Sequence, residues 1–87
     1  MPSDAVTAQL IAAVDHALGG DWQRAHEIVQ AHEDEPIANW IHGTVHWIEG
    51  DLSNAGYWFG RAGRHMSDHA TPDAALRAIR AALPRSG

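Results

Sequence analysis

Apolar residues recur every three or four positions along most of the chain, and glycine or proline interrupts this pattern at short intervals. The first stripe is the clearest, with Val6, Leu10, Val14 and Leu18 on one face. Such spacing is typical of amphipathic helices, and it predicts them over residues 4–18, 22–33, 36–49, 52–63 and 72–83. No segment alternates with a period of two, so we expect no β-sheet.

The ends of these predicted helices carry residues that begin and stop helices. Gly19-Gly20 and Gly50 stand where a helix should stop, and residues 63–70 are predicted to form a loop. Pro36 suits the first turn of its helix. Because the connections are short, we expect five helices packed as antiparallel neighbours. The predicted N-terminal caps are Ser3, Asp21, Asp51 and Thr71.

One phrase occurs twice, 30 positions apart. Residues 16–25 (HALGGDWQRA) and 46–55 (HWIEGDLSNA) share a histidine, a glycine, an aspartate and an alanine in register. A fixed period of this size is typical of stacked helical hairpins, each of which needs a neighbour to bury its apolar face. The usual role of such units is to present a surface to a partner.

The second copy and the residues around it resemble the tetratricopeptide repeat, although the period is 30 and not the family's 34. In the first copy His32 replaces an expected alanine. The phrase at 49–64 is also similar to small, uncharacterised bacterial helical proteins. The residues that carry the family resemblance are Gly43, Gly50-Asp51-Leu52, Ala55, Phe59 and Ala62 in the second unit, and Ala13, Gly20-Asp21-Trp22, Ala25 and Val29 in the first.

The resemblance implies a single all-α domain over residues 1–87. It would consist of two tetratricopeptide-like hairpins, at 4–33 and 36–63, and a capping helix at 71–83. In such arrays the positions of His42 and His46 pack toward the paired helix. The positions of Trp40, Thr44 and Trp47 line the concave groove.

Composition and charge narrow the cellular location and the kinds of partner that we expect. The net charge is −5, and residues 1–60 hold nine acids and one arginine, which argues against a nucleic-acid partner. There is no cysteine, no secretory leader and no stretch long enough to span a membrane, so we expect a cytoplasmic protein without a membrane partner. No nucleophile elbow, phosphate-binding loop or dinucleotide fingerprint is present, so an enzyme is not predicted.

The third predicted helix carries a polar stripe of Asn39, His42, His46 and Glu49. These four positions share one helix face, and two histidines four residues apart can ligate one divalent ion such as zinc. Glu49 could complete a three-ligand site, and His16 is a fourth candidate because it occupies the place of His46 in the first repeat. The alternative is that these histidines form hydrogen bonds within the domain, with no metal cofactor.

Aromatic side chains suggest a second kind of site. Trp40 and Trp47 are seven residues apart on one helix face, with Thr44 between them, and Tyr57 is expected near the surface. Tryptophan is enriched at the energetic centres of interfaces, so these four residues are the predicted partner-binding set. The alternative is that the first or the fifth predicted helix covers both indoles and completes a core that two repeats alone cannot supply.

Two functions follow from these patterns. The first is a small interaction module or scaffold that binds a protein or peptide partner or associates with itself as a homodimer. The second is a divalent-metal-binding protein, with a metal-dependent enzyme left open, that uses the face of His42, His46 and Glu49.

Overall fold

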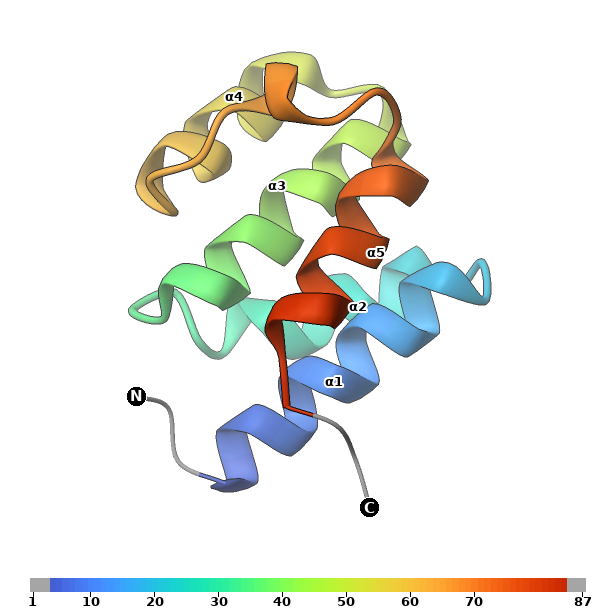
Figure 1. Cartoon of the computed structure of the whole chain (residues 1–87), viewed down its shortest axis with the longest axis vertical. Coiled ribbons are helices and arrows are strands. Elements are labelled where there is room, and N and C mark those ends of the chain that lie inside the picture. The colour runs from blue at the N-terminus through green and yellow to red at the C-terminus, as the bar shows by residue number, and fades with distance from the viewer. Residues whose placement is uncertain (1–3, 85–87) are drawn as a thin grey trace.

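The computed structural model describes residues 4–84, and over that range the protein is all-helical (Figure 1). The predicted all-α class is confirmed, and no strand occurs among these residues. Two helices stop two to three residues earlier than the apolar pattern predicts, and the predicted Ser3 cap lies outside the described range. The elements are α1 (Asp4–Leu18), α2 (Trp22–Gln30), α3 (Pro36–Glu49), α4 (Leu52–Arg61), the short 3-10 helix η1 (Met66–Asp68) and α5 (Pro72–Ala82).

The two copies of the repeated phrase fold into the same turn. Gly20 and Gly50 both adopt positive φ, at 94° and 84°, a conformation that glycine reaches without a steric penalty. The aspartate after each glycine caps the next helix by accepting a backbone N–H bond, at 3.1 Å for Asp21 and 3.4 Å for Asp51. The repeat in the sequence is therefore a repeated helix–turn–helix geometry.

Helix α3 is the central element of the fold. It packs against α1, α2, α4 and α5, and in the view of Figure 1 α5 lies to its right and α2 below it. Every residue from 38 to 45 is buried. An isolated amphipathic helix would expose one face. Because α3 is covered on both sides, its apolar stripe and its histidine stripe both contribute to the interior.

Helices α3 and α4 approach closely at one glycine. A Cβ atom on Gly43 would lie 2.6 Å from Cδ2 of Phe59 and 3.0 Å from the carbonyl oxygen of Ala55. Phe59 is 1% exposed, so its ring has little room to move. The absence of a side chain at Gly43 thus sets the spacing between the two helices.

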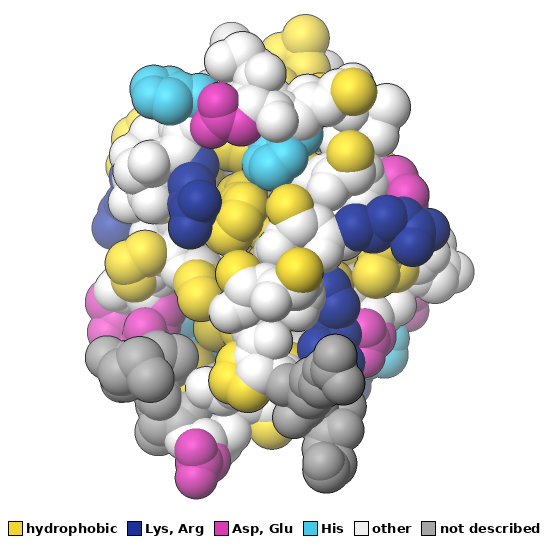
Figure 2. All heavy atoms as spheres, viewed as in Figure 1, with side chains coloured by type: hydrophobic (Ala, Val, Ile, Leu, Met, Phe, Trp, Pro, Cys, Tyr) yellow, Lys and Arg dark blue, Asp and Glu magenta, His cyan; other side chains and the backbone are white. Residues whose placement is uncertain are grey.

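Two arginines of the described part of the C-terminal third form ion pairs within the fold. Arg77 pairs with Asp73 at 2.7 Å and Arg80 with Asp15 at 3.2 Å. Basic side chains are spread over the face seen in Figure 2 and do not gather into one patch. This distribution differs from the basic stripe of a nucleic-acid-binding surface. Separately, no helix within residues 4–84 combines the length and the apolar character needed to cross a membrane.

Candidate metal centre

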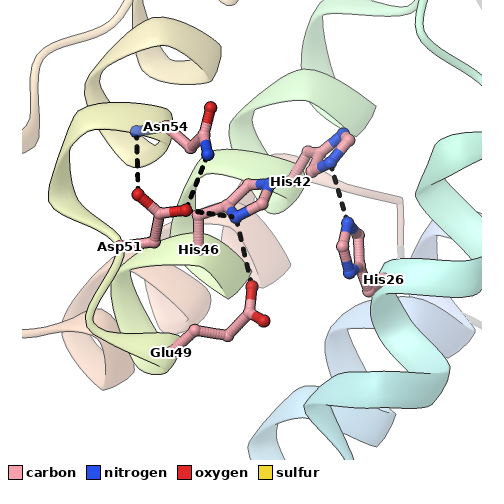
Figure 3. A network of polar contacts seen from close by, with 6 residues as sticks. All are labelled: His26, His42, His46, Glu49, Asp51 and Asn54. Atoms are coloured by element: carbon pink, nitrogen blue, oxygen red, sulfur yellow. Dashed lines mark hydrogen bonds and ion pairs between the residues drawn. The ribbon is translucent and has the colours of Figure 1, made fainter.

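Three histidine side chains from two helices converge between α2 and α3 (Figure 3). His26 comes from α2, and His42 and His46 come from successive turns of α3. The Nε2 atoms of His26 and His42 are 3.0 Å apart, and one ring nitrogen from each of the three residues lies within 4.8 Å of the others. We call this group the histidine triad.

The local sequence explains why these rings meet. His42 and His46 are four residues apart, so they point from the same side of α3, and their rings stack at 5.0 Å between centroids. His26 follows Ala25, whose fully buried methyl group lies in the core. Its ring, half-buried, reaches the other two at centroid distances of 4.8 and 5.0 Å.

The sequence prediction identified two of these three residues and missed His26. A signal for it existed, because His26 is four residues after Trp22 and three before Val29, at the border of the apolar face of α2. The sequence pattern does not show that α2 docks onto α3. Helical spacing relates residues within one helix and does not predict which residues of a neighbouring helix lie close to them.

Two residues predicted as metal ligands, Glu49 and His16, lie outside the histidine triad. Glu49 does not belong to the histidine triad, because its carboxylate lies on the far side of the His46 ring, with Oε1 3.1 Å from Nδ1. His16 is exposed in the last turn of α1 and is likewise outside the triad. In the repeat, α2 supplies the third imidazole to α3, and no described helix precedes α1 to do the same for His16.

Burial favours the neutral forms of His42 and His26. His42 is 3% exposed. Desolvation lowers its pKa from 6.5 to about 4, and repulsion from His26 and His46 acts in the same direction. Desolvation also lowers the pKa of His26, with repulsion from His46 adding to the effect and the charge of Glu49 opposing it. Neutral imidazole is the form that ligates a metal.

These pKa shifts predict that the metal-free protein loses stability as the pH falls from 6.5 toward 4. In that window the unfolded chain binds more protons than the folded one, so the free energy of unfolding drops with pH. For His42 we expect a loss of about 2 kcal/mol after screening. Urea unfolding in a chelator between pH 7.5 and 4.5 measures it.

The control for this pH prediction separates His42 from the other histidines. The variant His42→Leu should show a flatter dependence on pH, whereas His65→Ala, in an exposed loop position, should keep the wild-type slope. An identical slope in wild type and His42→Leu would contradict the assignment.

Aromatic contacts complete the surroundings of the triad. The indole of Trp58, on α4, stacks on the His42 ring with a centroid distance of 4.0 Å and an interplanar angle of 13°. The Arg61 guanidinium lies 5.1 Å from the Trp58 ring, within the range of a cation–π contact. Helix α4 therefore closes one side of the histidine triad.

The predicted partner-binding residues lie in different environments. Trp40 and Thr44 are 4% and 0% exposed, so neither lines an accessible groove. Arg64 and His69, from the segment that joins α4 to α5, lie against the Trp40 indole. Trp47 is half-buried, with its indole against Phe59 of α4. Of the four, only Tyr57 is well exposed, at 56%.

Comparisons of the chain with protein-family models, with curated proteins and with solved structures found no match. The resemblance to tetratricopeptide repeats therefore stays a prediction.

Proposed function

We propose that this protein binds one divalent transition-metal ion, best suited to zinc, through His26, His42 and His46. The observation that carries the proposal is the convergence of three imidazoles from two helices, with one nitrogen of each inside a span of 4.8 Å. Three histidine ligands and one remaining position are a recurrent arrangement for zinc in proteins.

The donor set favours particular ions. Imidazole nitrogens suit zinc, copper and nickel, whereas magnesium and calcium require oxygen ligands. The carboxylates of Glu49 and Asp51 lie 3.1 and 3.9 Å from Nδ1 of His46 and do not belong to the triad. A site without thiolates also fits a chain that contains no cysteine.

The distances between the rings require modest adjustment. Two nitrogens bound tetrahedrally to one zinc ion at about 2.05 Å are about 3.3 Å apart. The His26–His42 separation of 3.0 Å would open by about 0.3 Å, and the widest pair would close by at most about 1.5 Å. Rotation about side-chain bonds covers such shifts, and His26 and His46 are only half-buried.

The competing explanation is a purely structural histidine cluster. At 3.0 Å one of the two rings can donate a hydrogen bond to the other without any metal. Nδ1 of His42 is buried without a hydrogen-bond partner, and a metal bound at Nε2 would leave it so, which means that zinc binding itself must separate the two explanations. An interaction module built on Trp40 and Thr44 has less support than the metal site, because both side chains are buried.

Zinc titration of untagged protein tests the proposal. We expect native mass spectrometry to find one zinc ion per chain and calorimetry to give the same stoichiometry. At a free zinc concentration of about 100 times Kd, the folded state gains about 2.7 kcal/mol, which raises Tm by roughly 10–20 °C for a domain of this size. Absence of stoichiometric zinc, or equal binding of magnesium, would contradict it.

A further inference from the structure

The carboxylate of Glu49 lies against Nδ1 of His46, the ring nitrogen that faces away from the other two histidines. Oε1 lies 3.1 Å from Nδ1, and the two side chains are 28% and 14% exposed. Nδ1 is itself buried and has no well-aligned hydrogen-bond partner, so a small rotation of either group completes a bond there. Figure 3 shows the other ring nitrogen of His46 on the side toward His42.

The carboxylate of Asp51 also lies near His46, but it forms hydrogen bonds with another residue. Oδ2 of Asp51 is 3.9 Å from Nδ1 of His46, beyond hydrogen-bond distance. The oxygens of Asp51 instead accept bonds from Asn54, at 2.6 Å from its side-chain amide and 3.4 Å from its backbone N–H. Those bonds lower the pKa of Asp51 and commit it to capping α4. Glu49 remains as the partner for His46.

The internal repeat provides a comparison within the chain. Glu49 stands three residues after His46, and the equivalent residue after His16 is Gly19. The acid is therefore present in the copy whose histidine joins the triad and absent in the copy whose histidine is exposed. The helix cap does not require Glu49, because both copies form the same capped turn although one has glutamate and the other glycine at this position.

We propose that Glu49 is the positioning residue of the metal site, accepting a hydrogen bond from Nδ1–H of His46 so that the Nε2 lone pair faces His26 and His42. The inference rests on the proposed metal binding. Its physical basis is the outer-shell carboxylate, which fixes the tautomer and orientation of a ligating histidine and makes the ring a better donor. Loss of such a partner weakens metal binding by about 10–100-fold.

Two readouts on Glu49→Ala and Glu49→Gln test this role. In metal-free wild type, nitrogen-15 NMR should show His46 protonated at Nδ1, and Glu49→Ala should shift it toward the Nε2–H tautomer. Zinc affinity should fall by about 10–100-fold in Glu49→Ala and by less in Glu49→Gln, whose amide oxygen still accepts a bond. The matched control is Glu27→Gln, which removes one exposed acid next to His26 and should change zinc affinity less than threefold.

The two readouts also separate this inference from the metal proposal. The tautomer is measured without metal, so it reports on Glu49 even if the wild type binds no zinc. A His46 ring already in the Nε2–H form, or unchanged by Glu49→Ala, overturns the positioning role. Zinc affinity in Glu49→Ala equal to that of wild type overturns it as well. Failure of zinc to bind wild type overturns the metal site itself.

Discussion

Replacing His26 with alanine is expected to weaken zinc binding at least about 100-fold, or about 2.7 kcal/mol, while the helical fold stays intact. His26 is half-buried between α2 and α3, so its removal leaves a small gap. It is also the single ligand that α2 contributes. Without it, the ion keeps two ligands, both from α3. Calorimetric zinc titration, with circular dichroism to confirm helicity, measures the effect.

Matched histidine variants make this prediction specific. His16→Ala removes an exposed histidine at the equivalent repeat position and should leave zinc affinity unchanged. His46→Ala should reproduce the loss seen for His26→Ala. If His16→Ala weakens binding as much as His26→Ala, the ion is held elsewhere or nonspecifically.

The second large effect is expected at Gly43, where alanine should destabilise the fold by about 2–3 kcal/mol. Alanine normally favours a helix by about 1 kcal/mol over glycine. Here its Cβ atom would lie 2.6 Å from the buried Phe59 ring and 3.0 Å from backbone atoms of α4, so the two helices must separate. Thermal and urea unfolding should show a Tm lower by roughly 10–20 °C.

Gly56→Ala is the control for this substitution. Gly56 lies on the exposed side of α4, and no atom lies within 4 Å of its added Cβ. The same change there should raise stability by about 0.5–1 kcal/mol through helix propensity alone. A Gly43→Ala variant as stable as Gly56→Ala would show that α3 and α4 are not held at the spacing described above.

Most of the helix boundaries could be predicted from the sequence because local chemistry sets them. Asp21 and Asp51 cap their helices as expected, and Gly50 ends α3 in a left-handed conformation. These features depend on residues within one turn of each other. The histidine pair on α3 was also visible, since its spacing places both rings on one side of a single helix.

The remaining features depend on contacts between helices. His26 joins the triad only because α2 docks on α3, and Trp40 is buried only because segments after α4 lie against it. The role of Glu49 as neighbour and not triad member depends on which side of the His46 ring its carboxylate occupies. Helical spacing predicts which face of a helix a residue occupies, but it does not predict which side of a neighbouring ring its side chain reaches.

The histidine triad lies at a junction, between the second helix of one helix pair and the first helix of the next. Neither helix pair forms the site alone, because the first contributes one imidazole and the second contributes two. An assembly of n such pairs would therefore offer at most n − 1 such junctions. A lone pair would offer none, and two pairs are the smallest assembly in which the site can exist.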